Sequence, residues 1–150
     1  MVAPLFIGAL IAIFQTTLFL FAQANLQSAA VEGARLLMTG QAQNGGMTQS
    51  QFQSTICPMV QTLFNCSNLV ISVQNCSSGC STSAPQMYNA QGQLNPGTWD
   101  PGSPGDLMVV ELAYPWSVIS GPLGFTLANL PGGTALMMGV TAFRVEPYGS

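Results

Sequence analysis

The sequence has almost no ionic side chains: it contains no lysine, no histidine and only two arginines, against five carboxylates. The seven charged residues are Glu32, Arg35, Asp100, Asp106, Glu111, Arg144 and Glu146. A net charge of −3 on so few groups excludes an electrostatic nucleic-acid binder, because no row of basic side chains is available to neutralise phosphates. Weak surface charge also gives little protection against self-association, so the composition favours a protein that assembles with other copies of itself.

The lack of titratable groups also argues against an enzyme. Without His or Lys, every general base would have to be one of the five carboxylates, and no Ser has an evident activating partner. A hydrolase that uses carboxylates alone is the remaining enzymatic alternative. We therefore expect no catalytic residue and no cofactor.

Two aspartates are the candidates for a metal site. Asp100 and Asp106 lie in one loop rich in Gly and Pro. Their carboxylates and nearby backbone carbonyls could bind Ca²⁺, which takes about six to eight oxygen ligands. The alternative, which we favour, is that both are ordinary turn aspartates bonded to the local backbone.

The N-terminal segment carries no charged side chain before Glu32. As a helix, its apolar part Met1–Ala22 would span roughly 33 Å, which is enough to cross the hydrocarbon core of a membrane. From Ala22 to Thr39, apolar and polar residues recur on opposite faces at helical spacing, and Gly40 is a suitable residue to end the helix. We predict a stalk helix over 1–40, in lipid at one end and against a folded head at the other.

Two other interpretations of this segment are weaker. Ala22-Gln23-Ala24 resembles the cleavage site of a signal peptide, but no Lys or Arg precedes the apolar run, and the run is too long for a signal. A helix buried inside a soluble protein is disfavoured because a chain of 150 residues can hardly surround it.

Several residues of the stalk are candidates for contact with other subunits. Gly8 is small enough to let a neighbouring helix approach, and the Gln15 amide needs a partner, either on another helix or in a local or water-bound arrangement. Glu32 and Arg35, at positions i and i+3, form either a surface pair or a pair that fixes register in an interface. The large apolar candidates are Phe6, Leu10, Phe14, Leu18 and Phe21.

The remaining residues, 41–150, are expected to form one α+β head in which a small antiparallel sheet packs on the stalk helix. Thr48 and Gln51 have the spacing of a capping box and predict a second helix, which Pro58 should kink or interrupt. Pro115 is expected to close the second strand or to place it on an edge. The predicted elements are a loop over Gln41–Met47, a helix over Gln49–Phe64, strands over Asn68–Gln74, Leu107–Tyr114 and Ala135–Val145, a long loop over Cys76–Gly105, and a short helix near the membrane surface within Ser117–Leu130.

Four cysteines fall within residues 57–80. An even number of cysteines behind an export-type N-terminus favours disulfides, whereas their spacing and the lack of His disfavour zinc. We predict that Cys57 pairs with Cys66 and Cys76 with Cys80. An exchange between the two pairs is the alternative.

Short motifs in the same order along the chain resemble the TadE-type proteins, the pseudopilins of the tight-adherence (Tad) pilus system. The motifs are Val2-Ala3-Pro4-Leu5-Phe6, Ala29-Ala30-Val31-Glu32-Gly33-Ala34-Arg35, Thr39-Gly40-Gln41-Ala42, Ile56-Cys57 with Cys66-Ser67, Pro104-Gly105-Asp106, Tyr114-Pro115-Trp116 and Arg144-Val145-Glu146-Pro147-Tyr148. The resemblance runs over most of the chain and is poorest over Cys76–Gly102.

The resemblance implies a pilin-like fold and a non-enzymatic subunit that is processed by a prepilin peptidase. Such a subunit would sit in the bacterial inner membrane or periplasm before assembly and in an extracellular type IV-like filament afterwards, with copies of itself and the pilus machinery as partners. The alternatives are a minor pseudopilin that primes or adapts assembly, and a solitary membrane-anchored adhesive or ligand-binding domain. Family members usually carry a Glu-Phe pair shortly before the Val-Ala-Pro stretch. This sequence begins at Met1-Val2, so we expect a truncated chain, a misassigned start or different processing.

Overall fold

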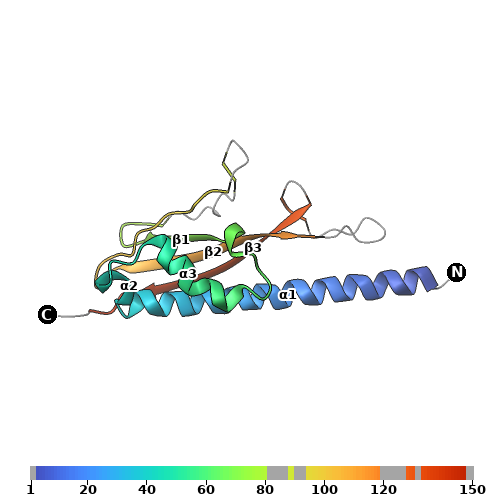
Figure 1. Cartoon of the computed structure of the whole chain (residues 1–150), viewed down its shortest axis with the longest axis horizontal. Helices are drawn as coiled ribbons and strands as arrows, with labels where there is room; N and C mark the ends of the chain where they lie inside the picture. Colours follow the sequence, from blue (N-terminus) through green and yellow to red (C-terminus); the bar gives the residue numbers. More distant parts are fainter. Residues whose placement is uncertain (1–2, 81–87, 90–93, 119–127, 131–132, 148–150) are drawn as a thin grey trace.

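The computed structural model describes residues 3–80, 88–89, 94–118, 128–130 and 133–147. Its elements are α1 (Ala3–Met38), α2 (Gln41–Asn44), α3 (Gln49–Val60), the 3-10 turn η1 (Cys66–Asn68), β1 (Val70–Asn75), β2 (Leu107–Ser117) and β3 (Thr134–Arg144). The long helix α1 runs along the three-stranded antiparallel sheet, and its N-terminal part projects beyond the other elements (Figure 1). The predicted α+β architecture of a long apolar helix, a small antiparallel sheet and a second short helix is confirmed.

The helix α1 is continuous because its sequence offers no break between its two ends. Pro4 lies in the first turn, where its missing N–H would have no helical partner anyway. The helix ends at Met38, and Gly40 then turns the chain with φ 73°, a left-handed conformation that glycine adopts without strain.

The short helices differ from the predicted boundaries. The expected loop after the stalk contains the single helical turn α2, held by the buried Ala42. In α3 the capping box of Thr48 and Gln51 is present as predicted. The helix continues through Pro58 and ends at Val60, four residues earlier than expected, because the chain then turns into η1.

The sheet has the order β1-β2-β3, and β2 runs further than predicted. Pro115 does not close the strand, which continues to Ser117. Pairing with β1 stops at the Val70–Ala113 pair, so beyond that point β2 pairs on one side alone within the part of the chain that the structure describes. On that side Leu136 lies opposite Pro115 and donates its N–H to the Asn129 carboxamide oxygen at 2.7 Å. The proline therefore sits in a local edge position, where no ladder hydrogen bond is lost.

The strand β3 joins the sheet to α1. The sequence predicted this strand one residue further along the chain. The residues of β3 that face α1 include Met137 and Gly139. Just after the strand Val145 is buried, and the N–H of Glu146 donates to the carbonyl of Met38 at 3.1 Å. The two ends of the head-bound part of α1 are thus both tied to β3.

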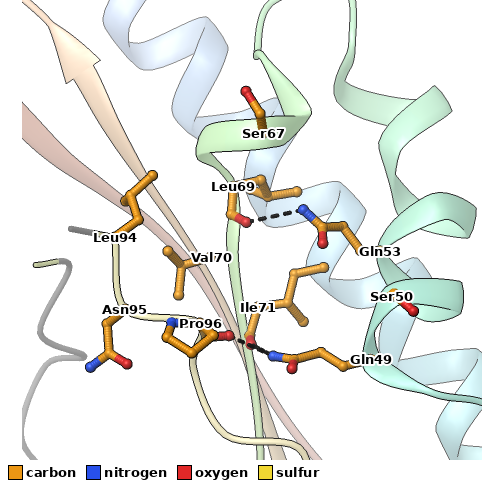
Figure 2. Close-up of a pocket in the computed structure, with 10 residues that line it drawn as sticks. All are labelled: Gln49, Ser50, Gln53, Ser67, Leu69, Val70, Ile71, Leu94, Asn95 and Pro96. Atoms are coloured by element: carbon orange, nitrogen blue, oxygen red, sulfur yellow. Dashed lines mark hydrogen bonds between the residues drawn. The ribbon is translucent and has the colours of Figure 1, made fainter.

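Glutamine side chains cover the two edges of the sheet. On the β1 side, the Gln49 amide donates to the carbonyl of Ile71 at 2.8 Å and the Gln53 amide to that of Leu69 at 3.3 Å (Figure 2). These amides line a shallow pocket of about 270 Å³ between α3, β1 and residues 94–96, and no lining residue is titratable. On the β3 side, Gln23 and Gln27 of α1 bond to the strand in the same way. Edge carbonyls and amides that would otherwise attract another strand are therefore occupied.

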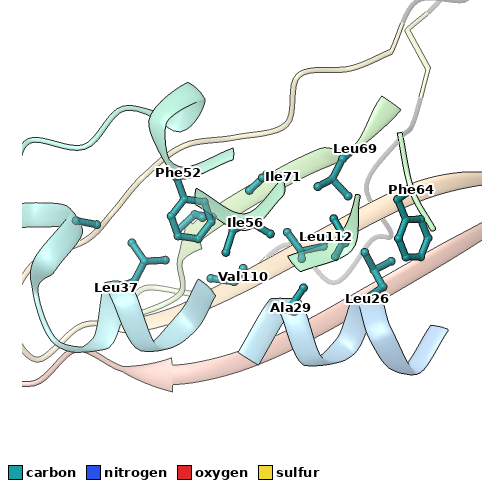
Figure 3. Close-up of a cluster of buried hydrophobic side chains, with 14 of the residues drawn as sticks. Leu26, Ala29, Leu37, Phe52, Ile56, Phe64, Leu69, Ile71, Val110 and Leu112 are labelled. Atoms are coloured by element: carbon teal, nitrogen blue, oxygen red, sulfur yellow. The ribbon is translucent and has the colours of Figure 1, made fainter. Parts of the chain in front are cut away.

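The core lies between α1, α3 and the inner face of the sheet (Figure 3). Gly33 lets α3 approach α1 closely, because a Cβ at that position would lie 2.9 Å from the ring of Phe52. Phe52 also packs against Trp99, with ring centroids 5.2 Å apart. The fully buried large side chains of this core are Leu26, Leu37, Phe52, Ile56, Val60, Ile71, Val73, Met108, Val110, Leu112, Met137 and Val145.

The loop after β1 covers part of the outer sheet edge. The N–H of Val73 donates to the Thr98 carbonyl at 2.8 Å, and the N–H of Asp100 donates to the Val73 carbonyl at 3.1 Å. The short helix expected within Ser117–Leu130 falls mostly outside the described residues, so it stays a prediction.

Candidate functional site

Most of the large exposed apolar side chains that the structure describes lie in the N-terminal half of α1. Among the described residues, α1 is the single helix long and apolar enough to cross a membrane; its most apolar 18-residue window has a mean hydropathy of 2.2 and is 6% buried. The first fully buried residue of α1 is Ala22. Apart from Phe19, which packs against the core of the head, the apolar side chains before Ala22 are left largely uncovered and need another apolar environment.

The predicted contact residues lie on two sides of this segment. The large side chains at Phe6, Leu10, Phe14, Leu18 and Phe21 are between 41% and 65% exposed. Their spacing of three or four residues forms one stripe along the helix. Gly8 and Gln15 are more covered and lie on another side of the helix. Contact of either side with a second helix stays a prediction.

The polar residues of the apolar segment differ in whether their side chains find hydrogen-bond partners. The hydroxyls of Thr16 and Thr17 donate to the carbonyls of Ala12 and Ile13, each at 2.8 Å, so they satisfy themselves within one turn. The Gln15 amide makes no side-chain hydrogen bond within the described part of the chain. In lipid such an amide is costly without a partner, which keeps Gln15 a candidate for contact between helices.

A pair of glutamines fixes the point where α1 meets the head, and the sequence analysis did not identify it. The Gln23 amide donates to the carbonyl of Met138. Gln27 bonds Val140 twice, donating to its carbonyl at 2.8 Å and accepting from its N–H at 3.0 Å. The sequence does contain a signal for this pair, because two glutamines four residues apart directly follow the apolar run. Gln23 was interpreted only as part of a possible cleavage site.

Glu32 and Arg35 form an ion pair of 3.3 Å on the surface of α1. Both side chains are at least half exposed, so within one chain the pair contributes a few tenths of a kcal/mol. A role in fixing register between subunits stays a prediction.

The four cysteines lie at disulfide distance in the predicted pairs. The Cα atoms of Cys57 and Cys66 are 5.8 Å apart, and those of Cys76 and Cys80 are 4.6 Å apart. The first pair ties the last turn of α3 to the chain that enters β1. The second pair closes the turn that follows β1.

The two aspartates considered for Ca²⁺ both act in turns. Asp106 accepts hydrogen bonds from the Ser103 N–H at 2.9 Å, the Ser77 hydroxyl at 3.2 Å and the Asn75 amide at 2.7 Å. The bond from the Ser103 backbone is the main cause that lowers the pKa of Asp106. Asp100 accepts from the N–H of Gly102 at 3.0 Å. The described ranges contain no cluster of three potential metal ligands, and the turn geometry accounts for both carboxylates.

Glu111 is the charged residue that the sheet buries. It lies on β2 opposite Ser72 and is 8% exposed, and its carboxylate accepts from the Gln74 amide at 3.4 Å. Burial raises the pKa of Glu111, with the Gln74 bond acting in the opposite direction. The ionised carboxylate therefore opposes folding at neutral pH.

We expect Glu111→Gln to stabilise the head at pH 7. The folded-state pKa of Glu111 lies above its unfolded value, so the folded chain loses stability as pH rises between the two values. The advantage of the Gln variant should shrink on acidification and vanish below the unfolded pKa, where Glu111 is protonated in both states. Urea unfolding of the full chain in detergent at pH 7 and at acidic pH measures this difference. Glu146→Gln, at an exposed carboxylate, is the control and should change little; equal effects of both variants would contradict the prediction.

The comparison with known families concerns α1. Residues 1–35 match the family model described as TadE-like protein. No curated protein and no solved structure matches the chain. The matched range holds the exposed apolar segment, the Gln23–Gln27 pair and the Glu32–Arg35 ion pair. The TadE-like family is a pilus-related structural family and not an enzyme family. The match covers less than half of the chain, and it suggests an association with a Tad pilus and an N-terminal membrane anchor.

Proposed function

We propose, on the premise of this TadE-like N-terminus, that the chain is a structural pilin-like subunit of a Tad-type filament. Its α1 anchors it in the bacterial inner membrane before assembly and packs into a helical core afterwards. The observation that carries the proposal is the set of exposed large apolar residues before Ala22. They are Leu5, Phe6, Ile7, Leu10, Ile11, Ile13, Phe14, Leu18, Leu20 and Phe21.

The driving force for assembly is the removal of this surface from water. Each such side chain contributes roughly 1.5–3 kcal/mol when it is fully buried. In the membrane the lipid covers it, and in a filament neighbouring copies of α1 would cover it. Moving the helix from one apolar environment to the other therefore costs little. Small residues such as Gly8 and Ala12 would allow close approach of those neighbours.

The head is suited to a role on the outside of such a filament. Its edges are covered by glutamine amides and its described surface carries few charges, so contacts between heads should be weaker and wetter than contacts between helices. The pilus machinery and other copies of the chain are the proposed partners, and the cell surface is the proposed destination.

Two alternatives differ in how the chain associates. A minor pseudopilin would enter filaments built mainly from another subunit, and a solitary anchored adhesive domain would not polymerise. Neither is favoured by a particular contact of the described residues.

Removing the exposed segment of α1 should abolish assembly. We expect a chain that begins at Ala22 to be monomeric, because it keeps the head-bound half of α1 with both glutamines and lacks the apolar stripe. Light scattering and negative-stain microscopy compare it with the full chain, which should form filaments once the detergent is removed. Phe14→Asp in the full chain is the matched point variant: it should block assembly and leave head unfolding unchanged. Ordered filaments from the chain that lacks residues 1–21 would refute the proposed mechanism.

A further inference from the structure

We propose that the free end of the β2–β3 hairpin contacts the lipid headgroup layer beside α1, as a second point of attachment of the head to the membrane. This hairpin end consists of Tyr114–Ser117 paired with Thr134–Met137. The inference rests on the proposed anchoring of α1 in a membrane.

The hydrogen bonds between α1 and β3 fix the depth of the hairpin end. The strand runs in the same direction as the helix, since Gln23 bonds Met138 and Gln27 bonds Val140. Ala135, three residues before Met138, lies up to about 10 Å further toward the N-terminus of α1 at ~3.3 Å per strand residue. That distance equals about six or seven helical residues, so Ala135 lies level with the region of Thr16.

This level is inside the apolar segment, not above it. If α1 spans the membrane up to Phe21, the hairpin end reaches about one and a half helical turns past the boundary of the head. The hairpin end points toward the N-terminal half of α1 (Figure 1). A head attached by α1 alone, with its sheet clear of the membrane, does not fit this register.

The chemistry of the hairpin end matches an interface between lipid and water. Trp116 pairs with Ala135 and is half-buried, and Tyr114 is close to it with ring centroids 6.4 Å apart. Trp and Tyr concentrate at the headgroup level of membranes because each has an apolar ring and a polar group. In sequence, residues 112–143 contain no charged side chain, so nothing in this stretch resists entry into the headgroup layer.

The opposite end of the head, in contrast, carries charged residues. Arg144 pairs with Leu107 at the far end of the sheet, and Glu146 bonds the end of α1 at Met38. The second tryptophan, Trp99, is also distant from the hairpin end: it bridges to Val73, which is aligned through β2 with Thr141 of β3. Six strand residues separate Thr141 from Ala135, or about 20 Å.

The two tryptophans provide the test and its internal control. The full chain is reconstituted into phosphatidylcholine vesicles containing a phosphatidylcholine brominated near the carbonyl end of its acyl chains, because bromine quenches tryptophan only at close range. Trp99→Phe leaves Trp116 as the emitter, and Trp116→Phe leaves Trp99. Flotation of the vesicles reports whether each variant is bound, and urea unfolding reports whether the head is intact. Trp116→Tyr replaces the second variant if the phenylalanine does not fold.

We expect the brominated lipid to quench Trp116 several-fold more than Trp99. If Trp116 and Trp99 were quenched equally, or if neither were quenched, in protein that floats with the vesicles, the inference would be overturned. The proposed anchoring by α1 would not be affected by that result. Trp116 shielded from both the brominated lipid and aqueous acrylamide would also overturn the inference, because the indole would then be covered by protein, either by Phe64 and Tyr114 of its own head or by a second protein surface. Failure of the full chain to float would instead refute the proposed anchoring, and the inference with it.

Discussion

Ending the chain at Gly133 is expected to abolish the cooperative unfolding of the head and not merely to lower its midpoint. The truncation removes β3, which supplies the buried Ala135 and Met137 and pairs with β2 along its whole length. It also removes the partners of Gln23 and Gln27, so α1 loses its contact with the sheet edge. Burial of this kind decides stability in a small domain, whose net free energy of unfolding is only about 5–15 kcal/mol. Circular dichroism during urea titration of the purified chain in detergent measures the loss.

A chain that ends at Pro147 is the matched control. It keeps the buried Val145 and the bond between Glu146 and Met38, so its unfolding midpoint should equal that of the full chain. If the chain ending at Gly133 unfolded with the same midpoint and the same change in ellipticity as this control, β3 would not be the strand that completes the head.

Gly139→Ala is expected to destabilise the head by about 1–3 kcal/mol, the range typical of overpacking. In most strands the opposite sign is expected, since Gly weakens a strand through its conformational freedom. Here a Cβ would lie 2.6 Å from the carbonyl oxygen of Leu26 and 3.1 Å from the Cα of Gln27. Both atoms belong to the backbone of α1, so neither can move without separating the helix from β3. Urea unfolding of the full-length variant gives the free energy.

The control for this substitution lies on the same strand. Ala142 is exposed, so Ala142→Val adds bulk to β3 without touching α1. We expect the valine to be neutral or slightly stabilising, because β-branched residues favour strands. A Gly139→Ala variant as stable as the parent would show that the helix and the strand are not packed this closely.

Elements with strong local signals were predictable from the sequence. The uninterrupted apolar run, followed by apolar residues at helical spacing, located α1 to within two residues at each end. The capping box at Thr48 located the start of α3. Alternating apolar residues located the three strands, with boundaries shifted by at most three residues.

Features that depend on distant parts of the chain were not predictable. Pro115 was expected either to end its strand or to place it on an edge. The structure has the edge position, and which alternative holds depends on where the neighbouring strand β1 stops. Gln23 and Gln27 bond to residues more than a hundred positions away, so local spacing gave no indication of their partners. The burial of Glu111 likewise goes with its register opposite Ser72, which lies on another strand and is not encoded next to it.

The parallel course of α1 and β3 decides how the head responds to mechanical tension. A pull on the N-terminal end of α1 acts along the helix and along the strand at once, and the two are joined at Gln23, Gln27 and Met38. Such a load shears these bonds together, with the interlocked backbone at Gly139 between them, instead of opening them one after another. The helix should therefore transmit force to the sheet before it peels away. A subunit held by its α1 in a fibre under traction would keep its head folded for as long as this shared joint holds.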